Sequence, residues 1–274
     1  MVNIGVLVNI NKETNVVKEF EKIRDLQLQS CQVCFWDPAL YTDEYAAQIN
    51  MAVKQTGVQV SAVWAGWTGP CFWNFYEGPI TLGLVPPAYR HTRLQELLAA
   101  SDFAEKINVT DIVTHVGFLP ENPNDPDFMG VVAVLKYLAG YMKNKNQFFL
   151  FETGQETPTT LVRTIECVGT GNLGINFDTA NLILYGKSNS VDAANTFGKY
   201  VRNLHCKDGE FPTNGSELGV EKALGQGKAN IAEVLKILKG CGYSGPLTIE
   251  REIHGDEQIK DIKAARDLLT EIWS

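Results

Sequence analysis

The chain has 274 residues, of which 45% are hydrophobic and 10% aromatic, enough apolar side chains for a large buried core. Its formal net charge of −8 argues against a nucleic-acid-binding protein, because such proteins usually present a basic surface. No run approaches the roughly 18 continuous apolar residues of a membrane span, and the N-terminal segment lacks the basic region of a signal peptide. We therefore expect a cytoplasmic protein without a membrane partner.

Strand-like and helix-like segments then alternate along the sequence, which predicts parallel α/β structure. Helical patterns follow the strands, with Thr14 expected to cap the first helix and another helix expected to begin near Thr92. Because a (β/α)8 barrel typically takes about 250 residues, we predict that residues 1–274 form a single TIM-barrel domain. The expected strands are short apolar runs at residues 3–9, 31–36, 58–64, 111–116, 147–152, 173–178, 201–205 and 246–250.

Two segments between the expected strands are longer than ordinary connections. Residues 65–90 are rich in glycine, proline and aromatic side chains, and residues 207–228 are rich in glycine and acidic side chains. Loops of this length inside a compact domain are usually functional. After the second segment, Asn230 and Glu233 have the pattern of a capping box. Glu156 is interpreted as a charge at the start of the helix that follows the fifth strand, with a supporting contact to the metal ligands as the alternative.

Four of the expected strands end in a side chain that can bind a metal. Glu152 ends Phe-Leu-Phe-Glu, Asp178 ends Ile-Asn-Phe-Asp, His205 ends Asn-Leu-His and Glu250 ends Leu-Thr-Ile-Glu. The spacings of 26 residues from Glu152 to Asp178 and 27 residues from Asp178 to His205 each match one βα unit. In a barrel, side chains at these positions all point into the mouth at the carboxyl ends of the strands.

Three carboxylates and one imidazole suit a divalent cation that prefers oxygen ligands and tolerates nitrogen, such as Mn²⁺, Co²⁺, Fe²⁺ or Zn²⁺. Calcium seldom recruits histidine, and structural zinc prefers thiolates. The alternative interpretation is that each carboxylate caps the next helix or pairs with a lysine. Four such residues at the same end of consecutive strands favour the metal site.

Several short motifs surround these four residues: Phe-Glu152-Thr, Asn-Phe-Asp178-Thr-Ala-Asn, Leu-His205-Cys-Lys-Asp208-Gly, Gly-Gln-Gly-Lys and Ile-Glu250-Arg-Glu. Together they resemble the xylose-isomerase-like barrel superfamily over nearly the whole chain. They are similar to its sugar phosphate isomerase/epimerase branch, which includes ketose 3-epimerases, inosose dehydratases and hydroxypyruvate isomerases. The resemblance is specific for the superfamily and does not choose the reaction.

In the ketose 3-epimerases of this family, the four matching residues hold Mn²⁺ or a similar ion. Carried over, the resemblance implies that Glu152, Asp178, His205 and Glu250 bind Mn²⁺, with Co²⁺, Mg²⁺ or Zn²⁺ as alternatives. It also implies that Glu152 and Glu250 are the catalytic pair. One removes a proton beside the carbonyl of a ketose or keto-polyol, and the other returns a proton to the enediolate from the opposite face. The expected activity is that of a metal-dependent sugar isomerase or epimerase.

The sequence departs from the epimerase pattern at two positions that normally touch the substrate. Asn181 stands where those enzymes carry a histidine, three residues after the aspartate ligand, and Phe211 stands where they carry an arginine. Asn181 is therefore a candidate for substrate binding. The same departures leave room for a lyase or dehydratase that acts on a keto-sugar derivative or an inosose with the same metal site.

Further candidates for substrate binding lie at or beyond the strand ends. His115 ends the fourth strand, Lys207 follows the histidine ligand, and Trp36 and Trp67 offer aromatic rings for the apolar face of a sugar. The alternatives are a structural histidine, a surface ion pair of Lys207 with Asp208, and tryptophans that only pack in the core. With no evident phosphate cradle, we expect an unphosphorylated small sugar as the substrate.

Two further alternatives belong to other classes. The DNA-repair endonucleases of the superfamily need a zinc cluster with more histidines than the four in this chain, and the acidic balance disfavours DNA. A non-catalytic carbohydrate-binding barrel remains open because a fold does not determine a function. We also expect that the protein can form a homo-oligomer.

Overall fold

The computed structural model describes residues 3–273 of the chain. Its barrel strands are Ile4–Asn9 (β1), Ser30–Phe35 (β2), Gln59–Ala65 (β3), Asp111–Thr114 (β4), Phe148–Glu152 (β5), Leu173–Asp178 (β6), Val201–Cys206 (β7) and Leu247–Ile249 (β10). The strands pair in parallel in this order, and β10 closes the sheet by pairing with β1. The predicted TIM-barrel fold is therefore confirmed.

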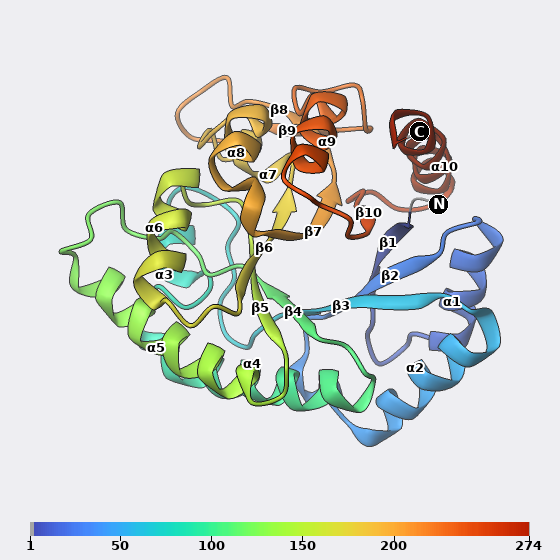
Figure 1. Ribbon diagram of the computed structural model, residues 1–274, viewed down its shortest axis with the longest axis horizontal. Coiled ribbons are helices and arrows are strands. Elements are labelled where there is room, and N and C mark those ends of the chain that lie inside the picture. The colour runs from blue at the N-terminus through green and yellow to red at the C-terminus, as the bar shows by residue number, and fades with distance from the viewer. Residues whose placement is uncertain (1–2, 274) are drawn as a thin grey trace.

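A long helix follows each barrel strand and packs on the outside of the barrel (Figure 1). These helices are Val16–Asp25 (α1), Asp43–Thr56 (α2), Pro87–Lys106 (α4), Pro126–Lys143 (α5), Pro158–Val168 (α6), Ser190–Phe197 (α8), Ile231–Gly240 (α9) and Asp256–Trp273 (α10). Shorter elements are the helices Gly78–Thr81 (α3) and Asn181–Leu184 (α7), the 3-10 turns Pro38–Leu40 and Gly198–Tyr200, and the strands Asp208–Glu210 (β8) and Val220–Lys222 (β9).

Strand β2 shows how the barrel separates its two faces. Cys31, Val33 and Phe35 pack in the large core between the strands and the helices, whereas Cys34 packs in a smaller cluster inside the barrel. Gln32 also points inward, since its side chain bonds with residues of β6 and β7. This alternation follows from the two-residue period of a strand. A polar residue at an inward position thus reaches the interior of the barrel.

The cap of α1 differs from the sequence prediction. Asn15, not Thr14, accepts the hydrogen bond from the backbone N–H of Lys18, at 3.1 Å. The hydroxyl of Thr14 instead accepts a hydrogen bond from the backbone N–H of Asn11, at 3.0 Å. Thr14 therefore closes the turn before the helix, and its neighbour is left to cap the helix.

Residues 65–90 are more ordered than a plain loop. They contain α3, and α4 begins at Pro87 rather than near Thr92, because proline fits the first helical position. The buried guanidinium of Arg93 ties the segment together by donating to the backbone carbonyls of Pro70, Thr81 and Gly83, at 3.0, 2.6 and 2.7 Å. The segment follows β3 at the mouth of the barrel, and Arg93 of α4 fixes its position.

Residues 207–228 also contain regular structure, because β8 and β9 pair as an antiparallel hairpin. Asp208 is buried and does not form the surface ion pair with Lys207 that the sequence allowed. Its carboxylate accepts hydrogen bonds from the backbone N–H groups of Gly225, Gly227 and Ala229, each at 2.9 Å. Asp208 thus anchors the loop that returns from the hairpin to α9.

The capping box predicted at Asn230 is wrong. Asn230 has a left-handed backbone with φ of 50°, and its side chain makes no capping hydrogen bond. The backbone carbonyl of Asn230, at 3.1 Å, bonds with the N–H of Glu233 instead. The left-handed conformation turns the side chain away from the helix, which the sequence pattern alone does not reveal.

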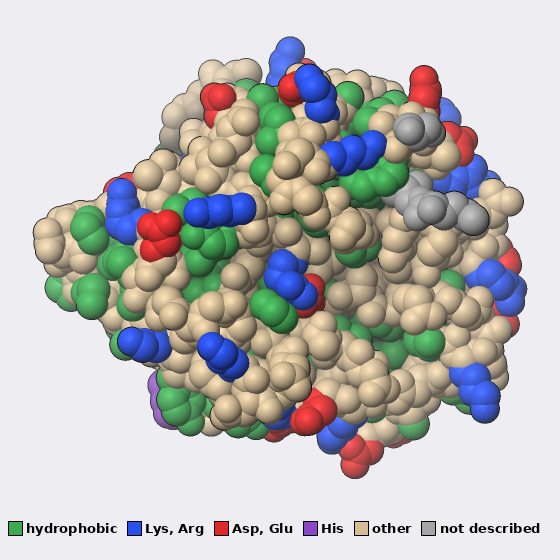
Figure 2. All heavy atoms as spheres, in the orientation of Figure 1, with side chains coloured by type: hydrophobic (Ala, Val, Ile, Leu, Met, Phe, Trp, Pro, Cys, Tyr) green, Lys and Arg blue, Asp and Glu red, His purple; other side chains and the backbone are tan. Residues whose placement is uncertain are grey.

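Every helix within residues 3–273 is too short or too polar to cross a bilayer. On the face drawn in Figure 2, lysines, arginines and acidic side chains are scattered among apolar and neutral groups instead of gathering in one patch. The expectation that the protein binds no nucleic acid stays a prediction.

Candidate metal centre

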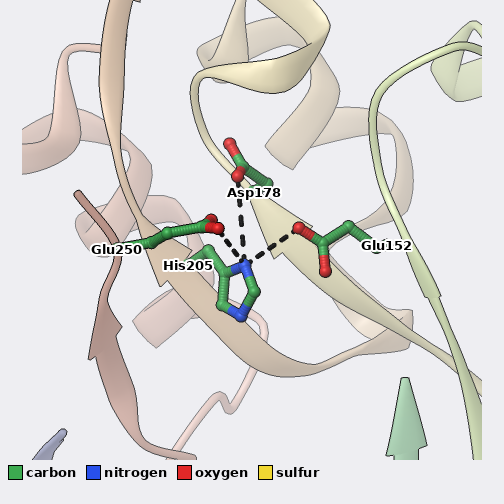
Figure 3. Close-up of side chains that lie close together, drawn as sticks. All are labelled: Glu152, Asp178, His205 and Glu250. Carbon is green, nitrogen blue, oxygen red and sulfur yellow. Dashed lines mark hydrogen bonds and ion pairs between the residues drawn. The ribbon is translucent and has the colours of Figure 1, made fainter. Parts of the chain in front are cut away.

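The four predicted ligands come together at the carboxyl ends of neighbouring strands. Glu152 ends β5, Asp178 ends β6, His205 lies in β7 beside Asp178, and Glu250 directly follows β10. Each of the four offers one ligand atom, and these atoms all lie within 4.8 Å of one another. Figure 3 shows Glu152 and Glu250 approaching the imidazole of His205 from opposite sides, with Asp178 at a third corner.

The distances around His205 define the centre. Its Nδ1 lies 2.9 Å from Oε1 of Glu152, 2.9 Å from Oε2 of Glu250 and 3.9 Å from Oδ2 of Asp178. The contact with Glu152 has hydrogen-bond geometry, whereas Oε2 of Glu250 is close without a hydrogen-bond partner among residues 3–273. The arrangement gathers three carboxylates around one nitrogen.

Inward-facing polar residues hold two of the ligands in orientation. Trp64 and Asn176 donate to Oε2 of Glu152, at 2.5 and 3.2 Å, which leaves Oε1 directed at His205. Gln32 donates to Asn176 at 2.8 Å, so its carbonyl oxygen faces Nε2 of His205, at 2.9 Å. When Nε2 carries the proton for this bond, Nδ1 keeps its lone pair for a metal.

Asp178 and Glu250 carry the observation that tests whether an ion fits. One oxygen of Asp178 accepts from the backbone N–H groups of Ala180 and Asn181, at 2.7 and 2.8 Å. Its other oxygen and Oε2 of Glu250 are buried without a hydrogen-bond partner in the described part of the chain. Buried carboxylate oxygens without partners are costly. A divalent cation would satisfy both, and the three-oxygen, one-nitrogen donor set suits Mn²⁺, Mg²⁺, Co²⁺ or Zn²⁺.

The electrostatics of the centre follow from burying like charges together. Burial raises the pKa of Asp178 well above its usual value, and the carboxylates of Glu250 and Glu152 add to the rise. Burial opposes the charge on His205, yet Glu152 and Glu250 outweigh it and raise its pKa. Burial also opposes the charge on Glu250, but Lys207 and His205 lower its pKa. The raised pKa values of Asp178 and His205 both reflect an excess of carboxylates at the centre, which a cation would offset.

Lys207 is buried beside the ligands. Its Nζ lies 2.8 Å from Glu252, 3.6 Å from Glu250 and 3.7 Å from Asp178. Burial opposes its charge, but these carboxylates outweigh burial and raise the pKa of Lys207. Lys207 is thus a charged group at the centre, and it also donates to Asn181 at 3.4 Å.

The centre opens into a cavity of about 690 Å³ at the barrel mouth. Of the four ligands, Glu152 and Glu250 line this cavity, whereas Asp178 and His205 are fully buried and absent from its described lining. The two glutamates are thus the ligands that a molecule in the cavity would meet. Trp36, from the predicted substrate-binding set, also lines the cavity.

His115 and Asn181 are the other predicted substrate-binding residues that line the cavity. Nε2 of His115 lies 3.8 Å from Glu152, and its ring packs edge-on against Trp73 with centroids 5.0 Å apart. Burial lowers the pKa of His115, although Glu152 acts in the opposite direction, so the imidazole is neutral.

Trp67 and Lys207 are placed differently from the other candidates. Neither is among the described residues that line the cavity. Trp67 is buried, and its ring contacts the ring of Trp36, at a centroid distance of 5.8 Å, and the guanidinium of Arg93, at 5.1 Å. Trp67 packs against Trp36, which lines the cavity. Lys207 contacts the carboxylates of the centre through its ion pairs.

Sequence reasoning missed the residues that orient the ligands. Gln32, Trp64 and Asn176 lie inside strands, and none was interpreted as a partner of the centre. The available signal was a polar side chain within an apolar strand, as in Ser-Cys-Gln-Val-Cys-Phe and Leu-Gly-Ile-Asn-Phe-Asp. Residues of this kind are rarely buried without partners.

The interpretation of Glu156 as a charge at a helix start is wrong. Its side chain is buried, and the carboxyl accepts a hydrogen bond from the backbone N–H of Gly154, at 3.3 Å. Burial raises its pKa to about 7. Thr157 caps α6, by accepting from the N–H of Thr160 at 3.4 Å. Glu156 therefore lies buried in the short loop between β5 and α6, next to Gln155 of the cavity lining.

Comparison with known proteins agrees with this geometry. Residues 20–272 match the family described as xylose isomerase-like TIM barrel. The chain belongs to this family. A crystal structure of a xylose isomerase domain protein from Planctomyces limnophilus is 37% identical, with a TM-score of 0.91, and the match covers 99% of this chain and 97% of that one.

More distant structures of the xylose isomerase-like barrel share the fold. A D-psicose 3-epimerase from Clostridium cellulolyticum H10, solved with D-tagatose, is 17% identical with a TM-score of 0.74, and 99% of each chain is covered. The 3-keto-D-glucoside 4-epimerase YcjR from E. coli is 14% identical with a TM-score of 0.73, covering 99% of this chain and 100% of that one. At these identities the likeness shows the fold alone.

Among other relatives, an uncharacterized protein from Methanocaldococcus jannaschii is 24% identical over 172 residues. The match covers 62% of this chain and 48% of that protein, so the chain spans about half of that relative's length. A family member from Mycobacterium smegmatis, 14% identical with a TM-score of 0.73 over 99% of this chain and 96% of that one, was solved in complex with magnesium.

Proposed function

We propose that this protein is a divalent-metal-dependent isomerase or epimerase of a ketose or keto-polyol. The observation that carries the proposal is the opposed pair of Glu152 and Glu250, both lining the cavity and both 2.9 Å from Nδ1 of His205. Membership of a family whose structural neighbours include sugar epimerases supports it. The ligands Glu152, Asp178, His205 and Glu250 would hold Mn²⁺, Mg²⁺ or a similar ion.

The two glutamates supply proton transfer on opposite sides of the reacting carbon. One carboxylate removes the proton from the carbon beside the carbonyl, and the other delivers a proton to the enediolate from the far side. Delivery to the same carbon inverts it, and delivery to the neighbouring carbon interconverts ketose and aldose. The bound ion would supply Lewis-acid polarisation of the substrate carbonyl.

Other residues of the chain prepare this proton transfer. Trp64 and Asn176 fix Glu152, so its free oxygen meets the substrate without reorganisation. Lys207 places a positive charge 3.6 Å from Glu250, which offsets negative charge that develops nearby. Neutral His115 can exchange hydrogen bonds with a substrate hydroxyl, and Trp36 and Asn181 complete the lining beside it.

A lyase or dehydratase of a keto-sugar derivative or inosose is the second candidate. It is favoured by Asn181, an uncharged amide that lines the cavity where the ketose 3-epimerases carry a histidine. The same enediolate would then lose a hydroxyl or an alkoxide from the next carbon. Product composition separates the two, because a lyase or dehydratase changes it and an isomerase does not.

The test is NMR of the metal-loaded protein in D2O with a panel of ketoses and keto-sugar glycosides. We expect deuterium to enter a C–H position beside the carbonyl, and we expect EDTA to stop the exchange. Sugar binding without exchange at any position would contradict the proposal and favour a non-catalytic carbohydrate-binding barrel.

A further inference from the structure

Buried polar atoms without partners concentrate at the cavity. Eleven such side-chain atoms occur in residues 3–273, and six of them belong to the centre or to the cavity wall. Asp178 and Glu250 account for two of the six and are explained by a cation. The remaining four are Nδ1 of His115, both amide atoms of Gln155 and the hydroxyl of Tyr185. These three residues, His115, Gln155 and Tyr185, all line the cavity.

Gln155 is the clearest case. It lies in the loop between β5 and α6, lines the cavity and is only 1% exposed. Neither its amide nitrogen nor its amide oxygen makes a hydrogen bond of full geometry in the described chain, although the amide lies in polar contact with the side chain of Tyr185. A buried amide that makes none of its hydrogen bonds is destabilising, and natural structures seldom keep one without a use.

The ring of Tyr185 is fixed by aromatic packing, whereas its hydroxyl makes no hydrogen bond of full geometry in the described chain. The ring packs edge-on against Phe75 and Phe118, with centroids 6.0 and 5.7 Å away. Burial raises the pKa of Tyr185 to about 12, with a weak hydrogen-bonding contact to Gln155 acting in the opposite direction, so the hydroxyl stays protonated and both side chains keep bonding capacity for a ligand. His115, Gln155 and Tyr185 follow β4, β5 and β6 in turn, which places them on one continuous wall.

We propose that Gln155 and Tyr185, together with His115, form a subsite that binds hydroxyl groups of an uncharged sugar or polyol, on the part of the substrate remote from the metal. This inference rests on the proposed sugar function and names the substrate class of the same cavity. An amide, a phenol and an imidazole each pair with hydroxyls, which both donate and accept. The subsite therefore makes Gln155 and Tyr185 specificity-determining residues.

The charges around the cavity favour an uncharged ligand. The two cationic residues in its described lining, Lys22 and Arg251, already pair with the carboxylates of Glu19, Glu221 and Asp261 at 2.7 to 3.1 Å. Lys207 is taken by Glu252 at 2.8 Å. A phosphate would need free cationic donors, which this wall does not present within residues 3–273.

The test compares two kinds of ketose by calorimetric titration of the Mn²⁺-loaded protein. D-Fructose and D-tagatose carry the remote hydroxyls, whereas dihydroxyacetone offers only a carbonyl and the hydroxyls next to it. We expect Gln155→Leu and Tyr185→Phe each to weaken hexulose binding by about tenfold, because each removes buried hydrogen bonds to the sugar. We expect dihydroxyacetone binding and Mn²⁺ affinity to change little.

Tyr41→Phe is the matched control. It also removes a buried hydroxyl without a partner, but Tyr41 lies outside the described lining of the cavity, so hexulose binding should not change. A second readout is thermal stability. Gln155→Leu should lower the Tm of the unliganded protein little, because the amide loses only its weak contact with Tyr185 and no hydrogen bond of full geometry.

Three results would overturn the subsite. They are unchanged hexulose binding in both variants, an equal loss for hexuloses and dihydroxyacetone, and wild-type protein that binds hexuloses no better than dihydroxyacetone. If D-fructose 6-phosphate binds as tightly as D-fructose, the inference that the ligand is uncharged is wrong. Hexulose binding that depends on Gln155, without deuterium exchange in D2O, would leave the subsite standing and remove only the proposed catalytic function.

Discussion

The barrel buries a polar cluster at each of its two ends, and the clusters differ in how fully they are paired. At the amino ends of the strands, the carboxylate of Asp111 bonds with Arg202 at 3.1 Å and Asn203 at 2.8 Å, so both oxygens have partners. At the carboxyl ends, Asp178 and Glu250 each keep a buried oxygen without a hydrogen-bond partner in residues 3–273. Buried carboxylates therefore have all their oxygens hydrogen-bonded at one end of the barrel but not at the other.

The difference distinguishes a structural cluster from a binding site. A buried carboxylate with both oxygens hydrogen-bonded needs nothing more from its surroundings. The partnerless oxygens of Asp178 and Glu250 have only ion-pair contacts with His205 and Lys207, and a buried oxygen without a hydrogen bond lowers stability until a ligand arrives. Stability given up in this way is common at functional sites. The two ends are also physically linked, because Gln32 lies 3.5 Å from Asn203 on one side and bonds with His205 on the other.

The largest expected effect separates the two ends by activity. Glu250→Gln removes one proton-transfer group, so deuterium exchange into the substrate should fall by about 10³-fold. Rates from NMR in D2O with the metal-loaded variant would measure this loss. Exchange at a near wild-type rate would remove Glu250 from the acid/base pair.

Asp111→Asn is the matched control at the other end of the barrel. It changes an equally buried carboxylate to an amide but stands far along the strands from the cavity, so the exchange rate should be retained. The amide accepts fewer hydrogen bonds from Arg202 and Asn203, and the free energy of unfolding should fall by about 1 kcal/mol. A large loss of exchange in this variant would contradict the contrast.

The next effect concerns metal affinity. Asp178→Asn keeps an oxygen for the N–H groups of Ala180 and Asn181. It removes the ionisable carboxyl group, whose pKa burial raises. We expect Mn²⁺ affinity to fall by at least about 100-fold, and we expect the Tm of the metal-free protein to stay level or rise. Titration calorimetry and thermal melts in EDTA would show both. A lower metal-free Tm would mean that the cluster is not strained by its own charge.

A smaller effect is expected from the residue that orients a ligand. Gln32→Leu removes the acceptor for Nε2 of His205, so the imidazole is free to change its tautomer. Mn²⁺ affinity should fall by about 10- to 100-fold. Gln59→Leu, at an exposed glutamine of β3, serves as the control and should bind Mn²⁺ normally. Equal affinities in both variants would argue that Gln32 has no part in the centre.

The last effect is on stability alone and depends on pH. Burial raises the pKa of Glu156 from its usual value of 4.5 to about 7, so between these values the folded state holds more protons than the unfolded chain. Stability should therefore fall as the pH rises through this window, by on the order of 2 kcal/mol. In Glu156→Gln this loss should be absent. Parallel denaturant titrations from pH 5 to 8 would test it, and identical slopes for the two proteins would refute the assignment.

The sequence by itself determined the barrel and the four residues that meet in the candidate metal centre. Apolar runs about one βα unit apart specify parallel strands, and a polar residue at the end of a buried run must face the mouth. These two regularities place Glu152, Asp178, His205 and Glu250 in one centre without knowledge of side-chain positions. The match to the family of xylose isomerase-like TIM barrels confirmed the barrel. In the structure, the candidate ligand atoms of the four residues lie within 4.8 Å of one another.

Only the tertiary structure decided which groups have partners. Gln32 and Asn176 meet the ligands across the barrel from a separation of 144 residues, and the free amide of Gln155 and hydroxyl of Tyr185 are defined by what surrounds them. Burial, and with it the raised pKa of Glu156, is likewise a property of packing. Periodicity in a sequence reports local direction, whereas pairing and desolvation depend on contacts between distant residues, which the local pattern does not encode.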